Sequence, residues 1–120
     1  MPHIIIEFSR DLASDTQIGT TLDAVHQAAA ATRLFDARHI RVRAYPVYLY
    51  RVGGNVVPFL HAQIRIHSGR TAEQKRQLSS AVLDALREHH RSAYSITVEV
   101  VEMERESYTR FIGEDVTRLA

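Results

Sequence analysis

The chain has 120 residues, a length that suits one globular domain with its own hydrophobic core. Its residues are 45% apolar and 24% charged, and none is cysteine, which excludes disulfide scaffolds and thiolate metal sites. No apolar run approaches the roughly 20 residues that a membrane-spanning helix needs, so we expect no membrane insertion. The lack of cysteine makes a cytoplasmic location the simplest expectation.

The formal net charge of +1 hides an uneven distribution of charge along the chain. Between positions 33 and 70 a single acid, Asp36, stands against the arginines at 33, 38, 41, 43, 51, 65 and 70. The stretch from Glu99 to Asp115 is acidic, with Arg105 and Arg110 as its only positive residues. A guanidinium binds a carboxylate with two parallel hydrogen bonds, so this pattern favours an acidic ligand, while a high genomic G+C content is an equal explanation.

The first half of the chain predicts a strand, a helix and a second strand. An apolar run predicts a buried strand over 3–8. Ser14 or Asp15 can cap the start of a helix. Apolar residues then recur at helical spacing and predict a helix that reaches about position 33, namely Ile18, Leu22, Val25 and Ala29. Alternation of apolar and arginine residues predicts a strand over 39–50, in which Pro46 is expected to bend or end the pairing.

The second half repeats this order after a glycine turn at Gly53-Gly54. Strict alternation predicts a strand over 59–67. Thr71-x-x-Gln74 has the spacing of a capping box and predicts the start of a second helix. A fourth strand is expected over 95–103, and residues 104–120 are expected to form a weakly structured acidic tail.

This order predicts an α+β fold in two layers, with a four-stranded sheet and two helices on one of its faces. We expect one domain, residues 1–120, made of two β-α-β halves at about 1–55 and 56–120. The other sheet face would be bare and would carry Arg41, Arg43, Gln63 and Arg65. With tyrosines at 45, 48 and 50 nearby, such a face favours contact with another subunit.

Two segments, AQIRIHSGRTAEQKRQL (62–78) and SITVEVVEM (95–103), resemble the subunit of the 4-oxalocrotonate tautomerases. The initial Met-Pro-His and HIRVRAY (39–45) are similar to the fused, double-length members of that superfamily, the 5-carboxymethyl-2-hydroxymuconate isomerases. The resemblance covers nearly the whole chain. It implies the tautomerase fold, a homotrimer, and a reaction that needs neither a metal nor an organic cofactor.

The resemblance also implies roles for four residues of this chain. Pro2 would be the catalytic base once Met1 is removed, Arg41 and Arg70 would bind carboxylates, and Tyr108 would be an aromatic wall. Each half keeps only part of this set, since Leu60 stands where the second half would need its own proline. The resemblance therefore implies one kind of active site per chain.

A terminal proline is a secondary amine, whereas an internal proline is an amide without basicity. Beside arginines such an amine would move a proton along a 2-hydroxy-dienoate to give the 2-oxo-enoate. The resemblance implies a di- or tricarboxylate substrate, 5-carboxymethyl-2-hydroxymuconate from homoprotocatechuate degradation. The alternatives are a tautomerase of phenylpyruvate-like enols, or a non-catalytic oligomeric module that binds an acidic ligand. Nucleic-acid binding is disfavoured, because the outward residues of strand 59–67 (His61, Gln63, Arg65 and His67) include no Phe or Tyr on which bases could stack.

Overall fold

The computed structural model describes residues 1–113. Its elements are β1 (His3–Ser9), α1 (Asp15–Ala31), β2 (Arg41–Val47), β3 (Phe59–His67), α2 (Ala72–His89) and β4 (Ser95–Met103). Two short 3₁₀ turns complete it, η1 (Ala37–His39) before β2 and η2 (Arg105–Ser107) after β4. Within the described range, no helix is long and apolar enough to cross a membrane.

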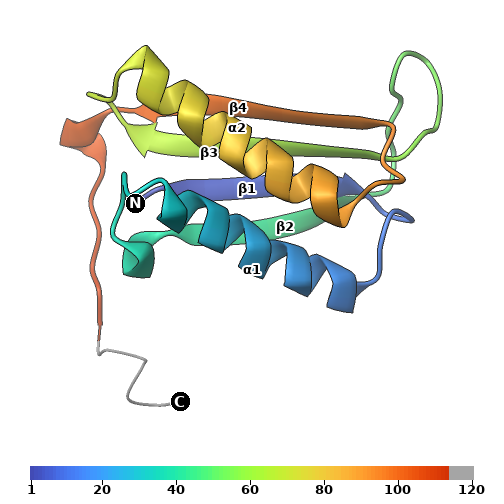
Figure 1. Ribbon diagram of the computed structural model, residues 1–120, viewed down its shortest axis with the longest axis horizontal. Coiled ribbons are helices and arrows are strands. Elements are labelled where there is room, and N and C mark those ends of the chain that lie inside the picture. The colour runs from blue at the N-terminus through green and yellow to red at the C-terminus, as the bar shows by residue number, and fades with distance from the viewer. Residues whose placement is uncertain (114–120) are drawn as a thin grey trace.

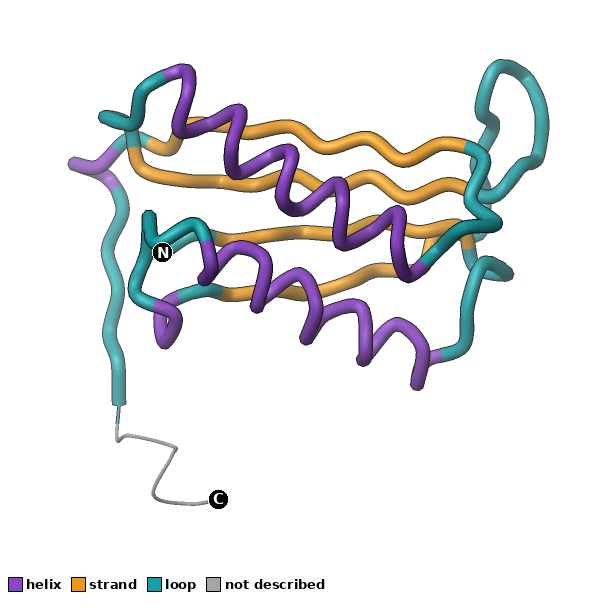
Figure 2. Tube along the Cα trace, in the orientation of Figure 1, coloured by secondary structure: helices purple, strands orange, loops and turns teal. Residues whose placement is uncertain are grey.

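The four strands form one sheet in the order β2-β1-β3-β4 (Figure 1). β1 and β2 are parallel, β3 and β4 are parallel, and the two inner strands β1 and β3 are antiparallel. Each parallel pair is joined by a helix, because parallel strands need a crossover connection. Both helices lie on the same face of the sheet (Figures 1 and 2), so the predicted two-layer α+β fold is confirmed.

The core lies between that face and the helices. In the sheet register Ile4 is opposite Val42 on one side and Ile64 on the other, and both isoleucines are fully buried. The helices contribute one apolar stripe each, with the buried residues Ile18, Val25 and Ala29 from α1 and Leu78, Val82 and Leu86 from α2. Removal of this apolar surface from water is the main term that stabilises the fold.

Both helices begin with a complete capping box. The Thr71 hydroxyl accepts a hydrogen bond from the backbone N–H of Gln74 at 3.1 Å, and the Gln74 side chain accepts from the backbone N–H of Thr71 at 2.9 Å. Ser14 and Gln17 repeat this arrangement at the start of α1. These bonds satisfy backbone N–H groups that have no partner inside the helix. The capping box predicted for the second helix is confirmed.

The second strand is shorter than expected, and Pro46 does not end it. Pro46 lies within β2, opposite Phe8 of β1. β2 is an edge strand, so a residue without an N–H group can be accommodated there. Residues 48–58 follow and extend beyond the sheet (Figure 1), with Gly53 and Gly54 at φ values of 57° and 84° as a tight turn requires.

The α1 face differs from the predicted one at one position. Thr21 is fully buried, whereas Leu22 is only partly buried. The Thr21 hydroxyl donates to the carbonyl of Gln17 at 3.0 Å and lies 2.6 Å from Nε2 of His90, at the end of α2. A buried hydroxyl is tolerated here because it has these hydrogen-bond partners.

The other sheet face carries the arginines that the alternation predicted. Its first cross-strand row contains Arg41 of β2, His3 of β1 and Arg65 of β3, and Arg43 follows two residues after Arg41. This open face ends where β1 begins, so it borders the N-terminus of the chain.

Candidate active site

A cavity of about 450 Å³ lies at the end of the sheet where β1 begins and β3 ends. The N-terminus and the segment that follows β4 meet on this side of the molecule (Figure 1). The residues that line the cavity come from four separate parts of the chain, and are Met1, Leu34, Phe35, Asp36, His39, His67, Arg70, Arg105, Tyr108 and Arg110.

The α-amino group of the chain lies in the wall of this cavity. The Met1 nitrogen donates to the carbonyl oxygen of His39 at 2.7 Å. Burial, together with the nearby charges of Arg41 and Arg110, lowers the pKa of this amine to about 6, against an opposing effect of Asp36. Pro2 follows as a fully buried residue whose carbonyl accepts from the backbone N–H of Arg41 at 3.0 Å.

Arg70 enters the cavity from the turn between β3 and α2. Gly69, with a φ of 116°, directs the chain into that turn in a conformation that other residues rarely adopt. The Arg70 guanidinium donates to the carbonyl oxygen of Leu34 and lies 5.6 Å from the centre of the Phe35 ring. These two contacts fix the cation in the cavity wall.

The segment after β4 supplies three further wall residues, Arg105, Tyr108 and Arg110. Nε of Arg105 donates to the carbonyl of Ser68 at 3.2 Å, which holds the segment against the turn after β3. The start of the expected weakly structured tail is more ordered than predicted, because η2 (Arg105–Ser107) and the contacts of Arg105 and Tyr108 hold it against the sheet. Residues 108–113 form no helix or strand, as expected, and residues 114–120 lie outside the described range. In the sequence, Arg105 and Arg110 stand out only as the two positive residues of an acidic stretch, on either side of Tyr108.

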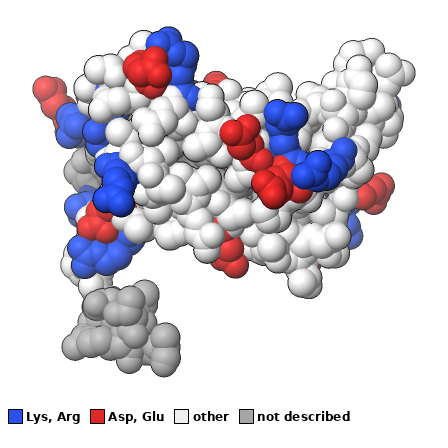
Figure 3. All heavy atoms as spheres, in the orientation of Figure 1, with Lys and Arg blue, Asp and Glu red and all other residues white. Residues whose placement is uncertain are grey.

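Positive charge in the cavity exceeds negative charge. Within residues 1–113, Arg70, Arg105 and Arg110 make no salt bridge. The carboxylate of Asp36 is already bound by Arg38, with contacts of 2.8 Å and 3.2 Å. Figure 3 shows Lys and Arg side chains gathered along the edge where the C-terminal segment leaves the sheet. A site with unpaired guanidinium groups is suited to an anionic ligand.

Tyr108 is held between two histidines. Its hydroxyl oxygen lies 2.9 Å from Nε2 of His3, and its ring meets that of His67 edge to face at 5.1 Å. Nδ1 of His67 is buried without a hydrogen-bond partner among the described residues. Burial and the charges of Arg105, the α-amine and Arg110 lower the pKa of His67, so the imidazole in the cavity wall is neutral near pH 7.

Of the four residues expected at the site, Arg70 and Tyr108 line the cavity and Pro2 directly follows the lining residue Met1. Arg41 does not line it. Its Nη1 donates to the carbonyl oxygen of His39 at 3.1 Å, and the Met1 amine donates to the same oxygen. Arg41 therefore lies beside the amine, and its charge lowers the pKa of that amine. Sequence reasoning did not select the other wall residues, among them the charged or titratable residues Asp36, His39, His67, Arg105 and Arg110.

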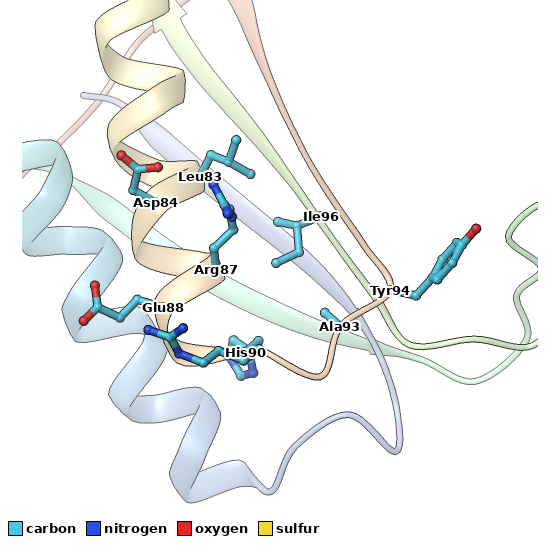
Figure 4. Close-up of a pocket in the computed structure, with 9 residues that line it drawn as sticks. Leu83, Asp84, Arg87, Glu88, His90, Ala93, Tyr94 and Ile96 are labelled. Atoms are coloured by element: carbon cyan, nitrogen blue, oxygen red, sulfur yellow. The ribbon is translucent and has the colours of Figure 1, made fainter.

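A second hollow, of about 820 Å³, lies at the opposite end of the sheet, beside the end of α2 and the start of β4. Figure 4 shows that its side chains come from α2, from the loop that follows it and from the start of β4, with Tyr94 projecting away from α2. Its charged residues include both signs, Asp84 and Glu88 with Arg87 and Arg91, and the α-amine is not among its lining residues. The smaller cavity is therefore the candidate active site.

Among the residues that the structure describes, no group of three or more His, Cys, Asp or Glu could hold a metal ion.

Comparison with known proteins gives the family. The family model of 5-carboxymethyl-2-hydroxymuconate isomerase matches residues 2–110. This chain belongs to the 5-carboxymethyl-2-hydroxymuconate isomerase family. Its membership supports an isomerase or tautomerase activity, and the matched range contains both Pro2 and all of the cavity residues except Met1.

Individual relatives of this isomerase family member are distant. The 5-carboxymethyl-2-hydroxymuconate Delta-isomerase of Escherichia coli is 25% identical over 91 residues, which are 74% of this chain and 72% of that protein. A crystal structure of a 5-carboxymethyl-2-hydroxymuconate isomerase from Deinococcus radiodurans R1 has a TM-score of 0.79 at 21% identity, covering 93% of this chain and 90% of that one. A symmetric trimer of fused 4-OT has a TM-score of 0.78 at 16% identity, with 87% and 88% covered. The two structures show the shared fold.

Proposed function

We propose that this protein is a cofactor-independent isomerase that moves a proton along a conjugated 2-hydroxy-dienoate, with the amine of Pro2 as the base after Met1 is removed. The observation that carries the proposal is the position of the chain's α-amine, in a cavity wall that also contains Arg70 and Tyr108. A primary amine at this terminus already has its pKa lowered to about 6. The same buried, cationic surroundings would keep much of a terminal proline unprotonated at neutral pH, as a general base requires.

The reaction follows from the groups available. The free amine takes the proton of the 2-hydroxyl group and returns it to a carbon further along the conjugated chain, which leaves the 2-oxo-enoate. Negative charge develops on the 2-oxo acid during transfer, and a guanidinium stabilises it. We assign this role and the binding of a remote carboxylate to Arg70 and Arg41, with Tyr108 as a wall of the site.

A substrate with several carboxylates suits the charge of the cavity, where three arginines have no acidic partner among residues 1–113. Among 2-hydroxy-dienoates we therefore propose 5-carboxymethyl-2-hydroxymuconate, in the degradation of aromatic compounds. This choice is also supported by the family of the chain and by the name of its Escherichia coli relative.

The test is the ultraviolet absorbance of the dienol, followed with protein whose mass establishes the loss of Met1. We expect rapid loss of absorbance with 5-carboxymethyl-2-hydroxymuconate, slower turnover of the enol of phenylpyruvate, and a large loss of activity in Pro2→Ala, which replaces the secondary amine of the proline ring with a primary amine. Faster turnover of phenylpyruvate enol would favour the alternative tautomerase. Tight binding of acidic ligands without any turnover would favour a binding module.

We also propose a homotrimer of this single, two-half domain. The open sheet face and the exposed residues Tyr48, Leu49 and Val56 of the projecting segment offer surface for subunit contacts. Related trimers such as that of fused 4-OT support the proposal. Light scattering on a sizing column should give three times the mass of one chain, and a monomer would contradict it.

A further inference from the structure

The hydrogen bonds around His3 have a direction that the chemistry of arginine determines. Nη1 of Arg43 lies 3.1 Å from Nδ1 of His3. A guanidinium has only donors, so Nδ1 of His3 must accept this bond and cannot carry a proton. His3 is therefore not an imidazolium, and its single ring proton is on Nε2.

That assignment fixes the next bond in the series. Nε2 of His3 lies 2.9 Å from the hydroxyl oxygen of Tyr108, so the imidazole donates and the phenol oxygen accepts. Burial and the charges of Arg43 and Arg41 lower the pKa of His3, which agrees with a neutral ring. The hydroxyl hydrogen of Tyr108 thus takes no part in this contact.

No residue in the described range accepts that hydrogen, since His3 provides the one hydrogen bond recorded for the Tyr108 side chain. Tyr108 lines the cavity, and its ring is fixed on one side by the ring of His67. A partly buried hydroxyl with a free hydrogen at a cavity wall needs an acceptor, and a ligand oxygen can provide one.

We propose that Arg43 and His3 are positioning residues that make Tyr108 a hydrogen-bond donor to the 2-oxo oxygen of the bound acid. This inference rests on the proposed function, in which that oxygen gains negative charge during proton transfer. A donor already aligned with this oxygen, and polarised by the bond from His3, would stabilise the charge without reorganisation. Tyr108 would then be more than an aromatic wall.

The tautomer of His3 is measured directly by ¹⁵N–¹H NMR on the unliganded protein. We expect a protonated Nε2 and an unprotonated Nδ1. Arg43→Met keeps an unbranched, flexible side chain and removes its donors, so a population protonated at Nδ1 should appear. Arg65→Met is the matched control, because Arg65 lies beside His3 in the sheet but makes no hydrogen bond to it within residues 1–113. A proton on Nδ1 in the wild-type protein would overturn the proposal.

The donor itself is tested by calorimetry with two ligands that differ only at the 2-oxo group, 2-oxohexanedioate and hexanedioate. We expect Tyr108→Phe to weaken the binding of the 2-oxo acid about three- to tenfold and to leave hexanedioate unchanged, with a smaller loss in Arg43→Met and none in Arg65→Met. An equal effect on both ligands, or none on either, would overturn the proposal. Since neither measurement requires turnover, an inactive wild-type protein with these binding differences would contradict the proposed function alone.

Discussion

The α-amino nitrogen of Met1 and Nη1 of Arg41 share one acceptor, the carbonyl oxygen of His39, at 2.7 Å and 3.1 Å. The arrangement brings a permanent cation next to the terminal amine. Burial contributes most to the lowered pKa of that amine, and the charge of Arg41 contributes next. The electrostatics of the site thus depend on a residue that does not line the cavity.

Arg41→Gln should raise the pKa of the Met1 amine from about 6 toward its ordinary value near 8, because loss of the cation stabilises the ammonium form. The pH dependence of amine acylation in Met1-containing protein measures this. The folded pKa lies below the unfolded one, so the free energy of unfolding should rise with pH between about 6 and 8, and less steeply in Arg41→Gln. Arg65→Gln is the control, since Arg65 is not among the charges that shift this amine; an identical pKa in Arg41→Gln would contradict the account.

Arg70→Gln should lower kcat/KM about 10- to 100-fold, the scale of about 1.5–3 kcal/mol for a hydrogen bond to a charged group. Arg70→Lys should recover little of this, because one ammonium cannot reproduce the planar fork that rests against Phe35. Steady-state kinetics on the dienol measure both variants. Arg87→Gln removes an exposed arginine of α2 outside the cavity and should be neutral; full activity in Arg70→Gln would exclude Arg70 from the site.

Because Arg105 and Arg110 lie in the cavity wall, we expect the site to bind diacids more tightly than monoacids. Hexa-2,4-dienedioate and hexa-2,4-dienoate share a carbon chain and differ by one carboxylate. Arg105→Gln and Arg110→Gln should each weaken the diacid about five- to tenfold, or ~1 kcal/mol, and the monoacid less, because two guanidinium groups without acidic partners are then available for the second carboxylate. Calorimetry measures this, and equal losses for the two ligands would mean a general effect of charge.

The strands and helices could be predicted from the sequence because their periodicity is clear. β3 and β4 begin and end at the expected residues, since alternation in one and an apolar run in the other stop at polar turns. β2 was predicted too long because the tyrosines after Pro46 have strand propensity, but they belong to the projecting segment. Pro46 is tolerated because β2 is an edge strand, and the order of strands in a sheet cannot be read from the residues around one proline.

The site was predictable only in part. Pro2, Arg41, Arg70 and Tyr108 followed from a resemblance, whereas Arg105 and Arg110 reach the cavity through the course of the segment after β4. That course depends on tertiary contacts such as the bond from Arg105 to the carbonyl of Ser68. His67 likewise continues the alternation of β3, and only the packing of Tyr108 against it reveals its position in the cavity wall.

The core makes a separate prediction about stability. Ile64 is fully buried at the centre of the sheet, opposite Ile4 on β1 and Val100 on β4. Ile64→Ala should lower the free energy of unfolding by about 2–5 kcal/mol, through lost burial and the cavity left behind. Denaturant unfolding measures it, and Val56→Ala, at a side chain that is 64% exposed, should change it by no more than about 0.5 kcal/mol. A small effect at Ile64 would mean that the core rearranges to fill the space.

The central claim is that the amine of Pro2 is the base, and it is tested most directly by comparing two preparations that differ only in Met1. Mass spectrometry identifies each, and the loss of dienol absorbance gives its rate. With Met1 present Pro2 is an amide, so we expect only residual activity; without it we expect full activity that rises with pH through a pKa below the ordinary α-amino range. Equal rates in the two preparations would contradict the account.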